Sequence, residues 1–145
     1  MKTQYSLLLL TLLLLGIFVL SYSYFTVLGS GGTFIFTRSD LTLSQLSFSP
    51  PQASTLDPVT IKVTLRNVGN DIARNLVVEF TDSTGNLLIG THKVESLAPN
   101  DFVDIEVPWF PKFFGSHVIN VFADSQNSVN ELDENNNQAT EIYRI

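Results

Sequence analysis

The sequence predicts an all-β domain of seven antiparallel strands in two packed sheets, preceded by one hydrophobic N-terminal helix. Three observations lead to this fold class. Residues 6–28 carry no charged side chain. From Asp40 onward, apolar residues recur at every second position in short runs, as in half-buried strands. Segments rich in Gly, Pro, Asn and Asp separate these runs at regular spacing, which is typical of an antiparallel sandwich.

The N-terminal run reads SLLLLTLLLLGIFVLSYSYFTVL over residues 6–28. It is long enough for a helix that crosses a hydrocarbon core of about 30 Å. Lys2 is the only basic side chain before Arg38. The positive-inside rule therefore places the N-terminus in the cytoplasm and the rest of the chain outside. We predict a single-pass membrane anchor over residues 1–28, and the residues expected to meet the bilayer are Leu7, Leu20, Tyr22, Tyr24 and Leu28.

A cleaved signal peptide is the alternative for this run, with Ser21 or Ser23 as the small residue before the cut. That alternative gives a secreted domain, and both interpretations place the domain outside the cytoplasmic membrane. Residues 29–39 begin with glycines and are predicted to be a short linker, although Phe34, Ile35 and Phe36 are unusually apolar for one. The sandwich domain is predicted over residues 40–145.

Each strand of the domain follows from alternation. In residues 40–48 the phase of the leucines shifts, which predicts a bulge near Ser44. In residues 59–67 the apolar side chains alternate cleanly with polar ones, and Pro108 marks a strand end or an edge strand. No helix longer than one turn is evident after Leu28. The predicted strands cover residues 40–48, 59–67, 76–82, 86–94, 102–110, 116–124 and about 138–145.

Antiparallel alternation also predicts which loops share an end of the sandwich. Loops 68–74, 95–100 and 124–137 are expected at the end where the chain arrives from the N-terminal segment. The hairpin turn 83–86 and the loop 110–116 are expected at the opposite end. If residues 1–28 are a membrane anchor, the first group faces the membrane.

The segment ADSQNSVNELDENNN, residues 123–137, contains four acids and five asparagines. A long turn explains it, because Asp and Asn side chains bond to nearby backbone groups, with Val129 and Leu132 closing the end of the sandwich. A structural calcium ion is the other hypothesis, because Ca²⁺ prefers such oxygen ligands. The spacing does not match an EF-hand loop. The candidate ligands are Asp124, Asn127, Glu131, Asp133 and Glu134.

The loop WFPKFFGS is rich in aromatic residues for its length. Phe110, Phe113 and Phe114 either fold over the end of the sandwich or form an exposed anchor for a partner. The second possibility makes this loop the candidate partner-binding site.

Composition excludes several classes of function. The net charge of −6 and the eight scattered basic residues disfavour nucleic-acid binding. There is no cysteine, and His92 and His117 lie on alternating strands where exposed positions are expected. No nucleophile or phosphate-loop motif is present, so we predict that the protein is not an enzyme and has no cofactor apart from the possible calcium.

Three stretches resemble the CARDB domain, the cell-adhesion-related domain found in bacteria and archaea. They are NVGNDIARNLVVEF, LAPNDFVDIEVPWFP and GSHVINVFADSQNSVNELDENNNQAT, and the signatures include Asn67, Gly69 and Trp109. The resemblance covers Asp40 to about Ile145. It implies an immunoglobulin-like β-sandwich, attachment to varied partners and no catalytic activity.

The sequence therefore predicts a membrane-anchored, non-enzymatic module for protein–protein interaction or adhesion at the cell surface. Its expected partners are a cell-surface or membrane protein and, through the N-terminal helix, the lipid bilayer. The alternatives are a structural subunit of a surface filament, motor or membrane complex, and a secreted module after signal-peptide cleavage.

Overall fold

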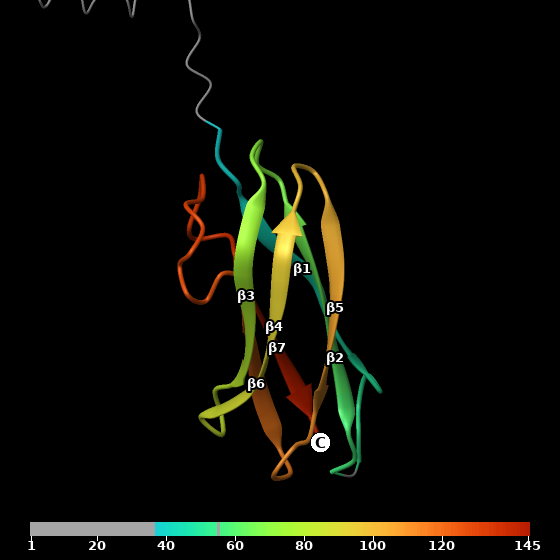
Figure 1. The fold of residues 1–145 in the computed structure, drawn as a ribbon. Coiled ribbons are helices and arrows are strands. Elements are labelled where there is room, and N and C mark those ends of the chain that lie inside the picture. The colour runs from blue at the N-terminus through green and yellow to red at the C-terminus, as the bar shows by residue number, and fades with distance from the viewer. Residues whose placement is uncertain (1–36, 55) are drawn as a thin grey trace, which may run out of the picture. The chain divides into compact units, whose positions relative to one another are not determined.

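The structure is a computed structural model that describes residues 37–54 and 56–145 (Figure 1). These residues belong to one compact unit that begins at Thr37. The predicted anchor lies outside the described residues, and so do its five candidate bilayer contacts. Within the described ranges, no helix is long and apolar enough to cross a membrane.

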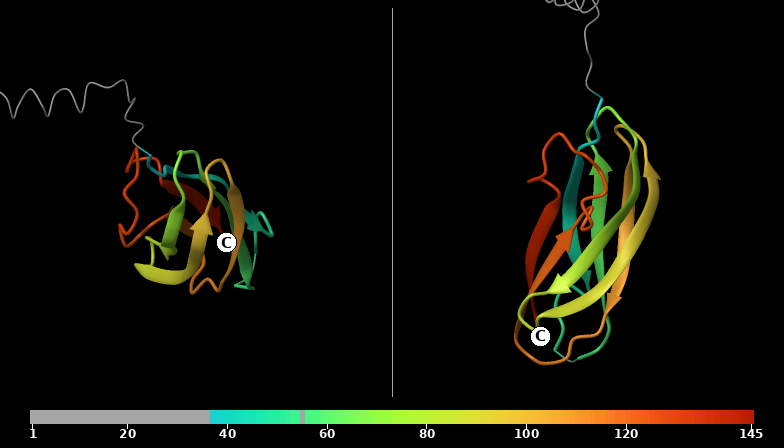
Figure 2. Two further views of the ribbon diagram at one scale, coloured as in Figure 1. Left: turned by 45° about the horizontal axis from the view of Figure 1, so that its top comes forward. Right: turned by 60° about the vertical axis from the view of Figure 1, so that its left-hand side comes forward.

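The unit is an all-β sandwich of seven antiparallel strands in two sheets, which confirms this part of the predicted fold class; the predicted N-terminal helix lies outside the described residues (Figures 1 and 2). The three-stranded sheet has the order β1-β2-β5, and the four-stranded sheet has the order β4-β3-β6-β7. The strands are β1 (Leu41–Ser49), β2 (Val59–Asn67), β3 (Ala73–Asp82), β4 (Leu87–Leu97), β5 (Phe102–Trp109), β6 (Ser116–Phe122) and β7 (Gln138–Arg144).

The core lies between the sheets and is built from the alternation seen in the sequence. On β2, Val59, Ile61, Val63 and Leu65 are buried, whereas Lys62 and Arg66 on the opposite face are exposed. The inward residues of β5 and β6 fill the same layer. Trp109 is the last residue of β5. Its ring packs edge-on against the rings of His117 and Tyr143, with 4.9 and 5.6 Å between the ring centroids.

Two irregularities occur where the sequence predicts them. The register between β1 and β2 shifts between Ser44 and Ser47, and Gln45 has a φ of 55°. A bulge of this kind accounts for the change of phase along β1. Pro108 lies on β5, which is an edge strand of the three-stranded sheet among the described residues, so its missing N–H is compatible with that position.

The two ends of the sandwich carry different loops (Figure 1). The end where Thr37 enters the unit, here called the proximal end, holds the β2–β3 and β4–β5 turns, with the β6–β7 loop beside it. The opposite end, here called the distal end, holds the β1–β2, β3–β4 and β5–β6 connections. This is the grouping of loops that strand alternation predicts.

Candidate functional site

The proximal end is organised around the buried side chain of Asn67, at the end of β2. Its amide Nδ2 donates to the carbonyl oxygens of Asp71, at 2.7 Å, and Leu97, at 3.0 Å. Its Oδ1 accepts hydrogen bonds from the backbone N–H groups of Asp40 and Gly69, each at 3.1 Å. One side chain therefore joins three segments of backbone, and every donor and acceptor of its amide is used.

The turn after β2 needs a glycine at position 69, because another backbone segment approaches it closely. A Cβ atom at this position would lie 2.6 Å from the backbone nitrogen of Asp40 and would clash with the carbonyl of Arg38. That close approach lets Asn70 N–H donate to Arg38 O at 2.9 Å, while Arg38 N–H donates to Asn70 Oδ1 at 2.8 Å. The last residues of the predicted linker 29–39 are therefore packed as part of the domain.

The β6–β7 loop, residues 123–137, begins with a turn held by Asp124. Its Oδ1 accepts hydrogen bonds from the backbone N–H and the hydroxyl of Ser128, at 3.1 and 2.7 Å. Its Oδ2 accepts from Val129 N–H at 2.7 Å. Asp124 and Asn127 both have positive φ, which these residue types tolerate better than most. The Asp124 carboxylate therefore stabilises the turn through hydrogen bonds to Ser128 and Val129.

Glu131 fastens the same loop to the start of β1. Its side chain is buried, with the residue 2% exposed, and its Oε2 accepts a hydrogen bond from Leu41 N–H at 2.7 Å. Its Oε1 accepts from Asn137 Nδ2 at 3.2 Å. Beside it, Leu132 N–H donates to Ser39 O at 2.9 Å, in a short parallel bridge. The loop therefore clasps the segment through which the chain enters the domain.

Burial raises the pKa of the Glu131 carboxyl to about 7. The hydrogen bonds from Leu41 and Asn137 oppose this rise, whereas the nearby carboxylates of Glu134 and Asp124 add to it. Desolvation is the largest cause, because a buried carboxylate loses more hydration than these partners replace.

The remaining acids of the loop also bond within it. Glu134 Oε1 accepts from Glu131 N–H at 3.0 Å, and Asp133 Oδ1 accepts from the backbone and side-chain amides of Asn135. Among residues 37–54 and 56–145, no three His, Asp or Glu side chains are grouped so that they could hold a metal ion. Calcium binding by Asp124, Asn127, Glu131, Asp133 and Glu134 therefore stays a prediction.

Two expectations for side chains were wrong. Leu132 does not close the end of the sandwich, because it is 55% exposed, whereas Val129 does pack against the core. His117 is not solvated and is fully buried. It follows the same phase on β6 as Ile119 and Val121, so the alternation alone could have placed it inward.

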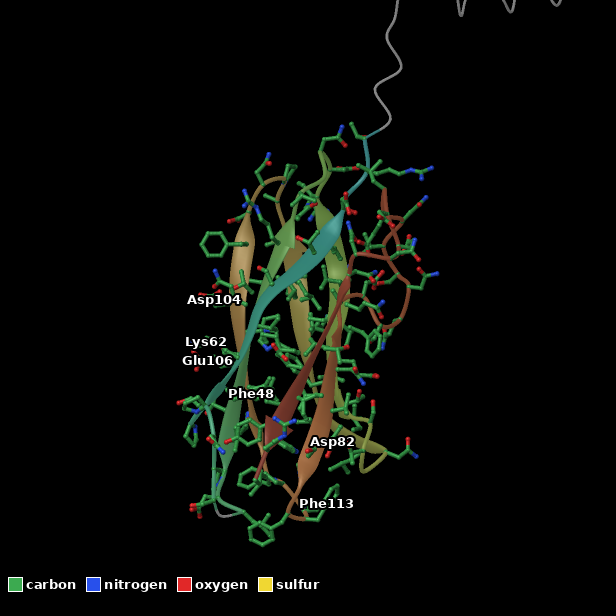
Figure 3. The ribbon with its side chains drawn as sticks, turned by 180° about the vertical axis from the view of Figure 1, so that it is seen from behind. Phe48, Lys62, Asp82, Asp104, Glu106 and Phe113 are labelled. Atoms are coloured by element: carbon green, nitrogen blue, oxygen red, sulfur yellow. The ribbon has the colours of Figure 1, made fainter. Side chains whose placement is uncertain are left out.

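His117 positions the distal β5–β6 loop. Its Nε2–H donates to the carbonyl oxygen of Phe113 at 2.9 Å, and its Nδ1 lies 2.6 Å from Asp82 Oδ2 at the end of β3. The ring of Phe113 stacks on the imidazole with 4.3 Å between ring centroids. Figure 3 shows Asp82 and Phe113 at this end of the molecule. The His–Asp pair cannot reach a substrate, because both side chains are buried and the second ring nitrogen is already bonded.

The three candidate partner-binding residues differ in exposure. Phe113 is 38% exposed and packs on His117, whereas Phe110 and Phe114 on either side of it are 55% and 62% exposed. One phenylalanine therefore packs onto the end of the sandwich and two face solvent, and partner binding by this loop stays a prediction. We call Phe110, Phe113 and Phe114 the distal aromatic residues.

Comparisons with known proteins agree with this architecture. A family model described as CARDB matches residues 38–141. A CARDB domain from Pyrococcus furiosus, crystallised in complex with di-metal ions, is 27% identical; the match has a TM-score of 0.67 and covers 76% of this chain and 96% of that one. A domain from Methanosarcina acetivorans, in a protein provisionally named a cell surface protein, is 23% identical with a TM-score of 0.57, over 74% and 91% of the two chains.

An enzyme also contains a domain of this fold. A β-glucosidase from Erythrobacter marinus is 17% identical with a TM-score of 0.51, and the match covers 72% of this chain but only 15% of the enzyme. The likeness is therefore one of fold alone, in a small part of a large enzyme. No curated protein matches the chain. Because the family model matches most of its length, the chain belongs to the CARDB family.

Proposed function

We propose that this chain is a non-enzymatic, membrane-anchored module whose sandwich lies outside the cytoplasmic membrane and binds a protein at the cell surface through its distal end. The observation that carries the proposal is the exposure of Phe110 and Phe114 on a loop that His117 and Phe113 hold in place. Aromatic side chains, phenylalanine included, are enriched at protein interfaces, and exposed apolar patches often mark binding sites.

The fixed loop is what makes these side chains suitable for binding. A partner gains the buried area of each phenylalanine ring, and little of that gain is spent on ordering the loop, because the stacked Phe113 ring and the bonded Phe113 carbonyl already order it. Gly85 of the neighbouring hairpin lies directly against the Phe113 ring, which restricts the loop from a second side.

The anchored arrangement is supported by the uncharged run over residues 6–28. The provisional cell-surface name of the M. acetivorans protein is consistent with an extracytoplasmic location. Intact mass and a carbonate wash of native membranes test this part. Full-length mass with retention in the membrane supports the anchor, whereas a mass that begins after about Ser23 and release into solution supports the secreted alternative.

The binding surface is tested by co-purification of the full-length chain from its native cells in mild detergent. We expect a partner to co-purify with the natural chain and to be lost from Phe110→Ser and Phe114→Ser. Phe102→Ser is the matched control, because Phe102 is 59% exposed but lies at the start of β5, at the proximal end. Equal loss from all three variants, or retention in all, contradicts a distal binding surface.

A further inference from the structure

We infer that the distal loop is coupled to a proton that His117 and Asp82 share, so that its position depends on pH. While the pair holds this proton, His117 keeps the loop on the end of the sandwich. When the proton leaves, the hydrogen bond to Phe113 is lost and residues 110–114 loosen. The inference rests on the proposed function, because it adds pH control to the same binding surface.

Both nitrogens of the His117 ring face oxygen acceptors. Nδ1 lies 2.6 Å from Asp82 Oδ2, and Nε2 lies 2.9 Å from the carbonyl oxygen of Phe113. A neutral imidazole carries one N–H, so it can donate to only one of these oxygens. The two hydrogen bonds therefore need one proton more than a neutral histidine beside an ionised aspartate has. That proton lies on Nδ1 or on Oδ2, and in either position the same pair shares it.

Burial makes the loss of this proton unfavourable for the observed arrangement. The side chains of His117 and Asp82 are 0% and 3% exposed, so water does not replace a lost bond. The other oxygen of Asp82 accepts a hydrogen bond from Thr84 N–H at 3.1 Å, which fixes the orientation of the carboxylate. Without the shared proton, a lone pair of the ring points at an oxygen atom.

The bond to Phe113 is the one that breaks. A hydrogen bond to a carboxylate is stronger than one to a carbonyl oxygen, so a neutral ring keeps its single N–H on Nδ1, toward Asp82. The Nε2 lone pair then faces the Phe113 carbonyl and repels it. The Phe113 ring stacks on the imidazole with 4.3 Å between centroids, and an aromatic face holds a cationic ring more strongly than a neutral one. Both contacts of Phe113 therefore weaken together.

The neighbouring side chains do not replace the shared proton. The Trp109 ring packs edge-on against His117 and does not titrate. Burial raises the pKa of the Tyr143 hydroxyl, which donates to a backbone carbonyl at 3.0 Å. Lys112 in the loop and Arg144 on β7 are the adjacent charged side chains among the described residues, and both are exposed.

The change is confined to the loop. Gly115 and Ile145 exchange two backbone hydrogen bonds, at 3.1 and 3.0 Å, and neither bond involves His117. The sandwich therefore stays folded while the exposed rings of Phe110 and Phe114 lose their fixed positions. A partner then has to order the loop on binding, so binding weakens as pH rises through the loss of the proton.

The test compares the full-length chain with Asp82→Asn in detergent micelles. In this variant the amide oxygen still accepts from Thr84 N–H, and the amide nitrogen takes the place of Oδ2 and donates to Nδ1 of a neutral ring. Nε2–H then stays on the Phe113 carbonyl without an extra proton. The variant therefore keeps the loop in place at high pH. Glu141→Gln is the matched control, because it removes an exposed carboxyl of β7.

Two measurements follow the proton and the loop separately. Ring nitrogen resonances report the protonation of His117 from about pH 5 to 9, with His92 as the internal reference. Cleavage after Lys112 by a lysine-specific protease reports loop opening. The rate for the natural chain is divided by the rate for Asp82→Asn at the same pH, which removes the pH dependence of the protease. We expect this ratio to rise about three- to tenfold as His117 loses its proton, because one hydrogen bond is lost. Glu141→Gln should behave as the natural chain.

Three results would overturn the inference. They are a His117 ring whose protonation stays the same over the whole range, a cleavage ratio that does not follow the ring, and a Glu141→Gln chain that behaves as Asp82→Asn does.

Recovery of the cellular partner at the two ends of the pH range separates this inference from the proposed function. Lower recovery at high pH with the natural chain than with Asp82→Asn supports pH control of binding. Equal recovery with both chains contradicts that control and leaves the proposed function standing. Recovery of no partner at either pH contradicts the proposed function, even where the loop follows the proton.

Discussion

At the scale of single residues, the polar groups buried at the proximal end are what fix its shape. Asn67 meets the backbone of three segments through four hydrogen bonds. A buried amide is costly to desolvate, and it is stabilising here because each of its groups has a partner. The Asn-x-Gly signature therefore has a structural role. Asn67 bonds the three segments together, and Gly69 allows the backbone of residues 38–40 to approach closely.

Replacing Asn67 by Ala leaves two N–H groups and two carbonyl oxygens without their partner. We expect Asn67→Ala to lower the free energy of unfolding by about 3 kcal/mol. Asn130→Ala is the control, because Asn130 is exposed, and it should change the value by less than about 0.5 kcal/mol. Urea unfolding of both variants measures the difference. Equal stability of the two variants would show that the hydrogen bonds of Asn67 do not stabilise the domain.

Glu131 makes the stability of the proximal end depend on pH. Its pKa of about 7 in the folded chain lies above its ordinary value of 4.5. Between these values the folded chain binds the proton more tightly than the unfolded chain, so stability falls as pH rises from 4.5 to about 7. Glu131→Gln stays neutral and keeps an oxygen that can accept from Leu41 N–H.

We therefore expect the free energy of unfolding of Glu131→Gln to fall less over this pH range than that of the natural chain. The control is Glu141→Gln, which removes an exposed carboxyl of β7. Urea unfolding at a series of pH values measures both slopes. A natural chain and a Glu131→Gln variant with parallel pH profiles would contradict a buried carboxyl with a raised pKa.

At the scale of elements, the strands could be predicted from the sequence because each sheet has one buried and one solvated face. The alternation on β2 and the phase shift near Ser44 on β1 translate directly into pairing and register. The position of Glu131 could not be predicted in this way. It depends on a bridge to Ser39, far away in the sequence, and an acidic residue in a polar loop gives no sign of burial.

For the distal loop as well, the sequence did not show which side chains are buried. The excess of phenylalanine was visible in the sequence, but which ring packs and which faces solvent depends on His117, and that residue was expected to be exposed. The alternation of β6 places His117 inward, and Asp82 and the Phe113 carbonyl supply the hydrogen-bond partners that a buried histidine needs.

The β6–β7 loop also carries the prediction of calcium. If a calcium ion binds there as a stabiliser, adding Ca²⁺ to chelator-treated protein should raise its melting temperature. Asp133→Asn and Glu134→Gln should reduce that rise, and Glu141→Gln should not. Scanning calorimetry of the full-length chain measures this. An unchanged melting temperature at saturating Ca²⁺ would mean that the hydrogen bonds of Asp124 and Glu131 hold the loop without an ion.

At the scale of the whole molecule, the two ends of the sandwich differ in the side chains that they carry. The proximal end is rich in acids and amides that bond to one another and clasp the incoming chain. The distal end presents the exposed side chains of Leu88, Phe110 and Phe114, together with Lys112, which has no carboxylate partner among the described residues.

The central claim is that this distal end is the binding surface, and site-specific photo-crosslinking in cells tests it most directly. A photoreactive phenylalanine analogue replaces Phe114 in one variant and Phe102 in another, two residues of similar exposure at opposite ends. The account predicts one discrete crosslinked product from position 114 and none from position 102. Crosslinking from position 102 alone, or equally from both, would contradict it.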